Sequence, residues 1–457
     1  MERVNFAETS MNQNNQAHKT IKITAWIFGL LLLWPILRSI STSNDLNIFF
    51  SAAERLTQLK NLYKPGYDSE GWVLNYYYSP LFATLLAPFT FLPKTTFLPD
   101  QVPLALIILK IVWATLMVWM ISDMVRIIKT IFPNLKTNSN ADLPSLIVNQ
   151  INFAAFRKGL FWAIFGFITW RWCFLNILYG QMTILILWGC MRAFEYPTSF
   201  TIRRIWTLPL GVNIKVLPIY LYGLFFLQGK FRTLLTLIAL LAATILLPYL
   251  YLPYEYHNEL IGAWLENINP FSQSHIIEVG EGGFVDFGAL VTKYFTSLHV
   301  PGEDRLMWFN MSKTGVFWIT QSFRLLVLFL SALLVFQFKK LPSFSWKEFW
   351  LFAVFLGAIP IAFPHQRDYS LMLQLPMLMI VWYHWVAGDR LMVFPYKFCF
   401  FLAAFLMGNL FFMEAFPSTL RLNWVGYRIQ GIGGLIFWIT FIVYSINFIQ
   451  RNKSDLE

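Results

Sequence analysis

One acidic residue stands just beyond the first apolar stretch, at the level where a membrane enzyme would need a base. Asp45 follows the apolar residues 23–40, and a run of three tyrosines comes later at 76–78. A carboxylate held at a membrane surface among aromatic rings can accept a proton from a hydroxyl nucleophile. Asn44 or Asp45 could equally cap an amphipathic helix over residues 44–60. Catalytic base and helix cap are therefore the two interpretations of Asp45.

The tyrosines and one later glutamine also have two interpretations each. Tyr77 and Tyr78 form either part of an interfacial aromatic belt or a platform for stacking a sugar ring. Gln181 follows Gly180 at the start of a later apolar stretch, where an amide needs hydrogen-bond partners. It either bridges helices or binds a substrate hydroxyl. We therefore treat Tyr77, Tyr78 and Gln181 as candidate substrate-binding residues.

Three basic residues are candidates for binding a phosphate group. Lys215 has the most apolar surroundings of any basic residue, and ionisable side chains within a membrane are functional candidates by default. As a point charge, a lysine suits a phosphate. Arg171 either anchors a helix end by snorkelling or binds the phosphate. Arg367, in the polar turn 364–369, could supply a cation for a leaving phosphate.

The turn 364–369 is the second-densest polar cluster, and it contains His365, Arg367 and Asp368. It is either an inert solvated turn or part of a site, with His365 as a proton partner and Asp368 in contact with substrate. The sequence has no Asp-x-Asp motif, no histidine ligand spacing and no glycine-rich nucleotide loop, so it predicts no metal site and no cofactor. Some acidic residues could still meet a divalent ion: Glu278, Glu281, Asp286 and Asp368.

The composition indicates an integral membrane protein. Of the 457 residues, 57% are hydrophobic and 13% are charged, against about 25% charged in soluble domains. The net charge is +11, but the basic residues cluster between apolar stretches, where they orient the chain and meet anionic membrane lipids. We therefore expect no nucleic-acid partner. The three cysteines lie in or beside apolar runs, which argues against a disulfide framework or a zinc site.

The apolar stretches predict an all-α polytopic protein with one membrane domain. A polar cytoplasmic tail at 1–22 precedes the membrane domain at 23–449, and a second cytoplasmic tail at 450–457 follows it. The basic loops all fit the cytoplasmic side of one alternating topology, which leaves the loops 41–79 and 254–314 outside the cytoplasm. The expected spans lie at residues 23–40, 103–125, 158–175, 182–194, 233–253, 315–338, 347–363, 370–386, 397–413 and 430–449.

Two segments interrupt the simple alternation of sides. Residues 80–93 are apolar but short, and residues 205–229 begin and end among basic residues and contain Gly211 and Pro218. We interpret both as re-entrant or broken helices, which occur at membrane depth where the backbone is buried in protein or lines a wet cavity. A pair of short tilted spans is the alternative for each. With them, the bundle contains about 10–13 transmembrane or re-entrant helices.

The order of several short motifs resembles the family 87 glycosyltransferases, which are polytopic GT-C enzymes that use polyprenyl-phosphate sugars. The resemblance extends over nearly the whole chain. Two stretches depart from the family pattern: residues 285–290, where the family commonly has an Asn-Gln-Ser-Leu-like stretch, and the turn at 363–369, where it tends to have a Ser-Pro…Trp…His-Tyr turn. The matching positions are Asp45, Ala52-Ala53, Leu62-Tyr63, Tyr77-Tyr78-Ser79-Pro80-Leu81, Ala87-Pro88-Phe89, Leu92-Pro93, Leu178-Tyr179-Gly180-Gln181, Ile214-Lys215-Val216-Leu217-Pro218 and Gly229-Lys230-Phe231-Arg232.

The resemblance implies a GT-C-like helical bundle with extracytoplasmic loops, in which Asp45 is the catalytic base of an inverting transferase. The donor would be a polyprenyl-phosphate-linked sugar, with mannose favoured, and the acceptor would be a hydroxyl on a lipid or glycan. Arg367, with Arg171 or Lys215, would bind the donor phosphate. The substrate contacts would come from Tyr77, Tyr78, Gln181, His365 and Asp368.

The expected location of the site agrees with a lipid-linked donor. If these residues face outward, the reactive side lies outside the cytoplasm, where nucleotide sugars and ATP are not generally available. For a bacterial chain this is the outer face of the plasma membrane. A transferase there must take its activated group from a carrier that crosses the membrane. The alternatives are a lipid or glycan transporter or flippase, and a polysaccharide polymerase or ligase.

Overall fold

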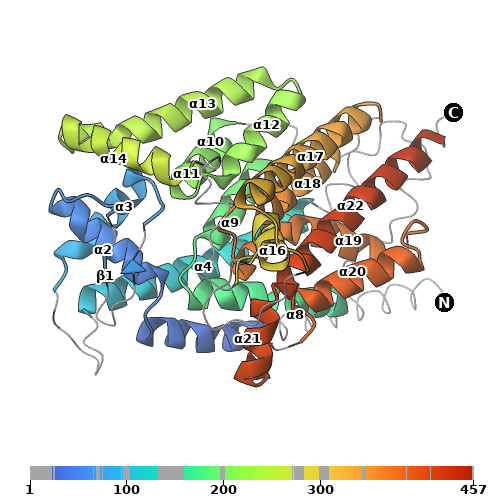
Figure 1. Ribbon diagram of the computed structural model, residues 1–457, viewed down its shortest axis with the longest axis horizontal. Coiled ribbons are helices and arrows are strands. Elements are labelled where there is room, and N and C mark those ends of the chain that lie inside the picture. Colours follow the sequence, from blue (N-terminus) through green and yellow to red (C-terminus); the bar gives the residue numbers. More distant parts are fainter. Residues whose placement is uncertain are drawn as a thin grey trace, which may run out of the picture.

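The computed structural model describes an almost entirely helical chain (Figure 1). Its one pair of described strands is a short antiparallel hairpin, in which Gly66 of β1 (Gly66–Tyr67) pairs with Leu74 of β2 (Val73–Leu74). The described residues are 23, 26–64, 66–67, 73–74, 76–93, 95, 103–131, 159–195, 201–269, 271, 283–297, 308–341, 346–387, 389–411 and 413–454. The expected N-terminal tail and residues 132–158 lie outside them, as do Glu278 and Glu281.

Four helices among the described residues are long and apolar enough to cross a membrane, as an α-helical polytopic membrane protein requires. Each is at least as long as the roughly 20 residues that a helix needs to cross a hydrocarbon layer of about 30 Å. Each also coincides with an expected span. They are α4 (Leu104–Ile131), α13 with η3 (Phe231–Leu246 and Leu247–Leu250), α17 (Lys313–Lys339) and α22 (Ile429–Ser454).

A bent pair of helices opens the described chain. The apolar helix Trp26–Ser41 meets α2 (Asp45–Thr57) at an angle of 45°. The inward face of α2 carries apolar side chains such as Leu46 and Phe49, while its other face is polar, which is the pattern of an amphipathic helix. We therefore treat α2 as lying outside the spanning helices.

The two segments expected to be broken are broken. Residues 80–93 form the short helix α3 (Pro80–Leu86) and the 3-10 turn η1 (Ala87–Phe91). Residues 205–229 form α11 (Thr207–Ile214), η2 (Leu217–Ile219) and α12 (Tyr220–Leu227). The second break falls at Lys215, where the backbone becomes extended and Pro218 follows.

The remaining helices are shorter than a full crossing or are enclosed by protein. At 1.5 Å per residue, the 12 residues of α9 extend only about 18 Å. The loop expected at 254–314 contains two helices, α14 and α16, which the sequence had not suggested. The bounds are α8 (Gly159–Leu178), α9 (Thr183–Phe194), α10 (Ile202–Ile205), α14 (Tyr254–Asn267), α16 (Phe287–Phe295), α18 (Lys347–Ala362), η4 (Asp368–Gln374), α19 (Leu375–Ala387), α20 (Phe394–Leu406), η5 (Met413–Ala415) and α21 (Ser418–Gly426).

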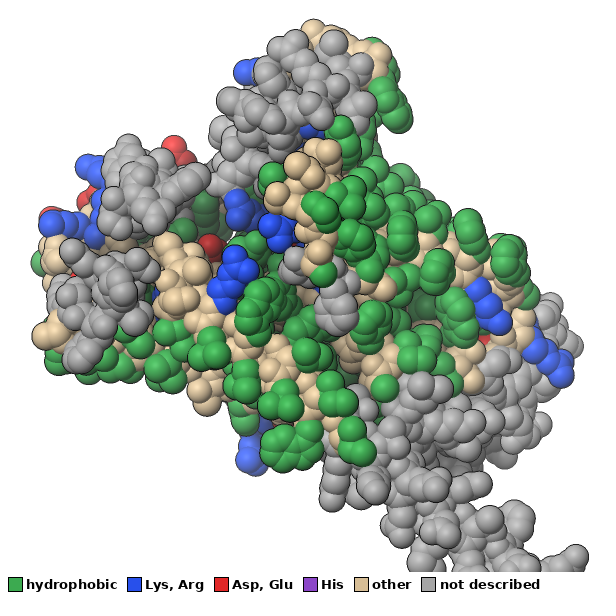
Figure 2. All heavy atoms as spheres, turned by 90° about the horizontal axis from the view of Figure 1, so that it is seen from below, with side chains coloured by type: hydrophobic (Ala, Val, Ile, Leu, Met, Phe, Trp, Pro, Cys, Tyr) green, Lys and Arg blue, Asp and Glu red, His purple; other side chains and the backbone are tan. Residues whose placement is uncertain are grey.

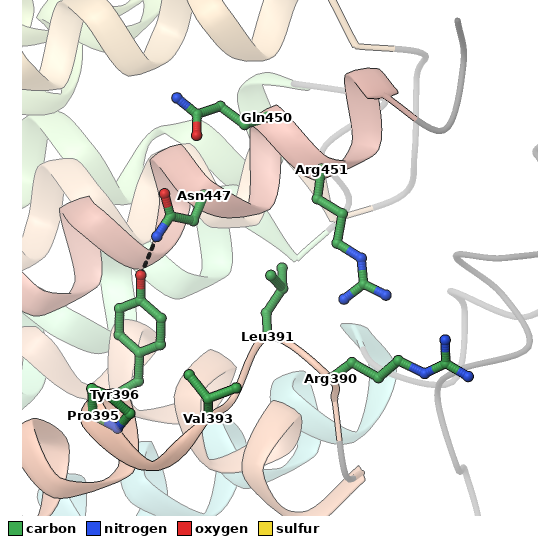
Figure 3. Close-up of a pocket in the computed structure, with 8 residues that line it drawn as sticks. All are labelled: Arg390, Leu391, Val393, Pro395, Tyr396, Asn447, Gln450 and Arg451. Atoms are coloured by element: carbon green, nitrogen blue, oxygen red, sulfur yellow. Dashed lines mark hydrogen bonds between the residues drawn. The ribbon is translucent and has the colours of Figure 1, made fainter.

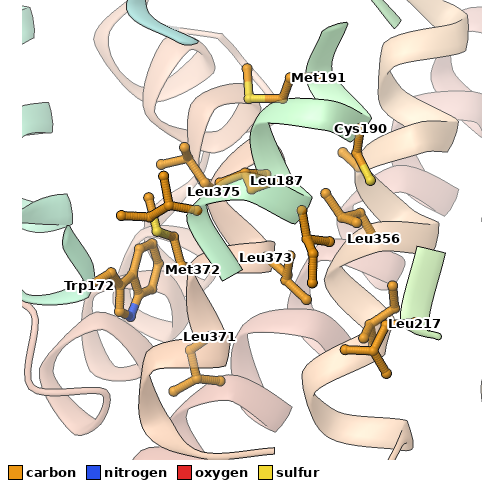
Figure 4. Close-up of a cluster of buried hydrophobic side chains, with 14 of the residues drawn as sticks. Trp172, Leu187, Cys190, Met191, Leu217, Leu356, Leu371, Met372, Leu373 and Leu375 are labelled. Carbon is orange, nitrogen blue, oxygen red and sulfur yellow. The ribbon is translucent and has the colours of Figure 1, made fainter. Parts of the chain in front are cut away.

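The core is built around α18, whose side chains are buried from Phe349 to Ala362. A helix that is apolar on every side is a buried helix, and α18 contacts α12, α17, α19, α22 and η4. Figure 4 shows the neighbouring apolar cluster, where Trp172 of α8, Leu187 of α9 and Leu356 of α18 surround η4. This packing fixes η4, and with it the polar turn that precedes η4.

Helix α22 joins two distinct ends of the molecule. Gln430, near its start, donates a hydrogen bond to Asp368 of the turn that leads into η4. Arg451, near its other end, approaches Asp389 between α19 and α20. The 26 residues of α22 extend about 39 Å, and α2 and the end of α22 lie at opposite ends of the long axis (Figure 1).

Candidate functional site

Asp45 does not cap its helix, because Asn44 fills that position. The Asn44 side chain accepts a hydrogen bond from the Leu46 amide at 3.1 Å, and the Asn47 side chain completes the capping box. Asn44 also donates to the Leu178 carbonyl at 3.2 Å. Asp45 therefore occupies the first helical position, and its carboxylate is available for another role.

A tight turn between α8 and α9 holds the start of α2 in place. The Asp45 amide donates to the Tyr179 carbonyl at 3.2 Å, and the Gln181 amide donates back to Asn176 at 2.8 Å. Gly180 has φ +64°, and a Cβ there would lie 2.7 Å from the Leu46 side chain. Only glycine allows this conformation and this approach without strain.

The turn places the side chain of Gln181 directly on the Asp45 carboxylate. The Gln181 amide nitrogen donates to Asp45 Oδ2, and Gln181 itself is buried. Of the two roles that the sequence allowed, bridging and substrate binding, the structure gives Gln181 a bridging contact between α2 and the start of α9. It orients the carboxylate.

Two cations face this carboxylate from distant parts of the chain. Lys215, at the break between α11 and η2, and Arg367, just before η4, both act on Asp45 as nearby positive charges. The Lys215 ammonium lies 6.0 Å from the centre of the Tyr369 ring. Lys215 and Arg367 also repel each other, and an anion between them would relieve that repulsion.

The surroundings of Asp45 set its acidity. Burial raises the pKa of the Asp45 carboxyl above its ordinary value of 3.8, while Arg367, the hydrogen bond from Gln181 and Lys215 each lower the pKa. The net direction is upward. A carboxylate with a raised pKa is a stronger base than an exposed one, and a base near the operating pH transfers protons efficiently.

The polar turn that carries Arg367 is held by the segment before α16. Phe284 pairs with Arg367 as an isolated β-bridge, and the Val285 amide donates to the Gln366 carbonyl at 2.6 Å. The Arg367 guanidinium lies 5.8 Å from the centre of the Phe284 ring. Backbone pairing and a cation–π contact thus direct Arg367, which argues against an inert solvated turn.

Aromatic rings surround this turn: Tyr77 contacts its residue His365, and Tyr78 lies nearer to Asp45. The His365 ring stacks on Tyr77 at 5.6 Å and meets Phe284 edge-on at 5.9 Å. Tyr78 is buried and its ring is close enough to feel the charge of Asp45, whereas Tyr77 is more exposed. The pair therefore separates into an inner ring beside the carboxylate and an outer ring on His365.

Arg171 and Asp368 form an ion pair with each other. Arg171 Nη2 lies 3.1 Å from Asp368 Oδ2, with side-chain exposures of 5% and 14%. Asp368 also accepts hydrogen bonds from the Tyr369 amide at 2.9 Å and from Gln430 at 3.4 Å. These contacts join α8, η4 and α22, so we assign Arg171 and Asp368 to holding the turn in place.

A space-filling view shows a hollow in the predominantly hydrophobic surface, with Lys and Arg side chains gathered around it and an acidic side chain exposed there (Figure 2). A basic rim of this kind attracts an anionic substrate. Among the described residues, no group of three or more His, Cys, Asp or Glu side chains could hold a metal ion.

No family model matches the chain, and no curated protein and no solved structure matches it. The function must therefore be argued from the geometry of the site.

The structure brings together four of the residues that the sequence singled out: Asp45, Gln181, Lys215 and Arg367. Sequence reasoning did not single out Tyr369, whose ring centre lies 6.0 Å from the Lys215 ammonium and which is close enough to Asp45 to feel its charge. Its signal was its place as the last residue of the polar turn 364–369. Asp286, a possible cation ligand in the sequence, instead caps α16 by accepting from the Ala289 amide at 3.1 Å.

Proposed function

We propose that the protein is an inverting glycosyltransferase of the GT-C type, which moves a sugar from a polyprenyl-phosphate donor to an acceptor hydroxyl. The observation that supports this most is the meeting of one oriented carboxylate with two cations. Gln181 orients Asp45, and Lys215 and Arg367 face it. The reaction needs a base and a phosphate site next to each other, and these residues supply both.

In the proposed reaction, Asp45 accepts the proton of the acceptor hydroxyl as that oxygen attacks C1 of the donor sugar. The new bond joins the acceptor oxygen to C1, and the bond between C1 and the phosphate oxygen breaks. The electron pair leaves with polyprenyl phosphate. The acceptor attacks from the side opposite the leaving group in a single displacement, so the configuration at C1 is inverted, and no covalent intermediate on a second carboxylate forms.

Lys215 and Arg367 carry the developing negative charge of the leaving phosphate. Positive groups fixed in advance near a developing charge are commonly the largest contribution to catalysis. Lys215 acts as a point charge, and Arg367 can offer a planar pair of donors to phosphate oxygens. The rings of Tyr78 and Tyr369, both buried near Asp45, form apolar walls on which a sugar ring can stack.

The side of the membrane is also part of the proposal. Helix α22 connects the turn of Arg367 to an end where Arg390 and Arg451 lie. Basic residues favour the cytoplasmic side, so we assign the Asp45 site to the opposite, extracytoplasmic face. The resemblance to family 87 glycosyltransferases favours mannose as the sugar. For a bacterial chain this is the outer face of the plasma membrane.

The test is a transfer assay with the full chain reconstituted in vesicles and a labelled polyprenyl-phosphate mannose. Asp45→Asn keeps the shape of the side chain but removes the base, and should lower the rate by roughly 10²–10⁴-fold. Glu54→Gln is the matched control, because it removes an acidic group from the same helix α2.

Full activity of Asp45→Asn would remove Asp45 as the base. A wild-type protein that moves labelled lipid across the vesicle membrane without releasing polyprenyl phosphate would instead indicate a transporter. The two readouts are measured in the same vesicles, so the outcomes are distinguishable.

A further inference from the structure

Tyr369 lies close to all three charged groups of the Asp45 site. Its ring centre is 6.0 Å from the Lys215 ammonium, and its ring meets the Tyr179 ring at 6.4 Å. The Tyr179 carbonyl in turn accepts the hydrogen bond of the Asp45 amide. The charges of Asp45 and of Arg367, which belongs to the same polar turn, both act on the Tyr369 hydroxyl. Tyr369 is therefore a neighbour of the base and of both cations.

The backbone of Tyr369 is fixed by hydrogen bonds on both sides. Its amide donates to Asp368 Oδ1 at 2.9 Å, and its carbonyl accepts from the Asn176 side chain at 3.1 Å. Asn176 is fully buried in α8, and Tyr369 is only 6% exposed. The packing therefore sets the position of the ring before a ligand arrives, as a preorganised site requires.

The Tyr369 hydroxyl makes no hydrogen bond to any residue that the structure describes. Two tyrosines beside Tyr78 do use their hydroxyls: Tyr63 donates to the Tyr78 carbonyl and Tyr76 to the Ser79 carbonyl, each at 2.9 Å. A buried hydroxyl without a partner is costly. A ligand that brings an acceptor atom to Tyr369 would remove that cost.

The Lys215 side chain also has donors to offer. Within the described part of the chain its ammonium makes no hydrogen bond, and the residue is only half-buried. An ammonium group carries three donors and no acceptor. Lys215 and Tyr369 together thus fit a ligand with several acceptor oxygens. The positive charges of Lys215 and Arg367 favour an anion over a neutral sugar hydroxyl at this position.

We propose that Tyr369 is a catalytic residue, whose hydroxyl donates a hydrogen bond to the phosphate of the polyprenyl-phosphate donor beside Lys215 and Arg367. This inference rests on the proposed function, because the phosphate is that of the leaving group. The phosphate gains negative charge when its bond to C1 breaks, and a hydrogen bond to a more charged oxygen is stronger. The bond from Tyr369 therefore strengthens as the leaving group departs, which is what lowers the barrier.

The test measures binding and needs no turnover. Farnesyl phosphate, a short polyprenyl phosphate, and farnesol are each titrated into the full-length protein in detergent, and bound ligand is measured by native mass spectrometry. Tyr369→Phe removes only the hydroxyl. It should weaken farnesyl phosphate binding by roughly tenfold, the effect of one hydrogen bond to a charged group, and leave farnesol binding unchanged. A purely structural role of Tyr369 would change the binding of both ligands alike.

Tyr396→Phe is the control, because it removes a hydroxyl from a different groove that also contains arginines. This groove lies at the other end of α22 and is lined by Arg390 and Arg451 (Figure 3). The Tyr396 hydroxyl accepts a hydrogen bond from Asn447 there. If the phosphate were bound in that groove, its binding would respond to Tyr396→Phe and not to Tyr369→Phe. We expect Tyr396→Phe to bind farnesyl phosphate like the wild-type protein.

The outcomes separate this inference from the proposed function. If the wild-type protein binds farnesyl phosphate more tightly than farnesol and Tyr369→Phe keeps that full preference, Tyr369 is not a phosphate ligand, while the transferase proposal stands. Weaker binding in Tyr396→Phe with unchanged binding in Tyr369→Phe would move the phosphate to the other groove. If the wild-type protein binds both ligands alike, it has no phosphate site, and the proposed function fails together with this inference.

Discussion

Replacing Arg171 should destabilise the protein and leave its affinity for the donor unchanged. The sequence made Arg171 a candidate phosphate ligand beside Arg367, but the structure pairs it with Asp368 at 3.1 Å. The pair joins α8 to the start of η4, and Gln430 of α22 contacts the same carboxylate. The substitution Arg171→Met keeps the length of the side chain and removes its charge.

The magnitude follows from the burial of both partners. The side chains of Arg171 and Asp368 are 5% and 14% exposed, so neither charge is solvated by water when its partner is removed. Breaking a buried ion pair by removing one partner costs about 3–5 kcal/mol of unfolding free energy. Two neutral donors, the Tyr369 amide and Gln430, still contact Asp368, which favours the lower part of this range.

The assay is a double-mutant cycle of unfolding free energies in detergent. The single variants Arg171→Met and Asp368→Asn each leave one buried charge without its partner. The double variant leaves neither, so it should lose less than the sum of the two single losses, by about 1–3 kcal/mol. KM for the donor is measured on folded Arg171→Met protein, with Arg367→Gln for comparison.

We expect KM to stay near the wild-type value in Arg171→Met and to rise in Arg367→Gln. The reasoning would be refuted if Arg171→Met unfolded like the wild-type protein and raised KM as much as Arg367→Gln. That result would make Arg171 a phosphate ligand.

Three further predictions concern the carboxylate and its supports. Gln181→Leu removes the donor that orients Asp45, so kcat should fall by roughly tenfold to a hundredfold, part of what a positioned base contributes, while KM for the donor changes little. Gly180→Ala forces a side chain into a backbone with φ +64° and against α2, and should lower the unfolding free energy by about 1–3 kcal/mol. Because burial raises the pKa of Asp45, kcat/KM should fall on acidification at a pH above the ordinary 3.8 of an aspartate. Lys215 and Arg367 lower that pKa, so Lys215→Gln and Arg367→Gln should each move the acid limb to higher pH, and a shift to lower pH would contradict the assignment.

Local breaks in the fold could be predicted because they depend on local sequence. Pro218 and Lys215 end the helical path within 205–229, and the structure breaks there. The spans predicted from long apolar runs were found where the runs were longest, as in α4 and α17. The helices α14 and α16 were not predicted, because α14 is only weakly apolar and α16, with nine residues, is much shorter than a membrane span.

The contents of the site could be proposed from residue types, but the roles of similar residues could not. Arg171 and Arg367 are both arginines at the ends of apolar stretches, and only the fold shows that one faces Asp368 and the other faces Asp45. Asn44 and Asp45 are both good caps, and which one caps α2 depends on backbone geometry. These choices are made by long-range packing, which no short motif records.

The central claim is that a single base and a cation pair carry out one displacement at C1. The most direct test is the configuration of the product, measured by NMR after transfer of mannose from a polyprenyl-phosphate donor of known anomeric form. The account predicts a product with the opposite configuration at C1 and one polyprenyl phosphate released for each sugar transferred. Retention of the donor configuration would contradict it.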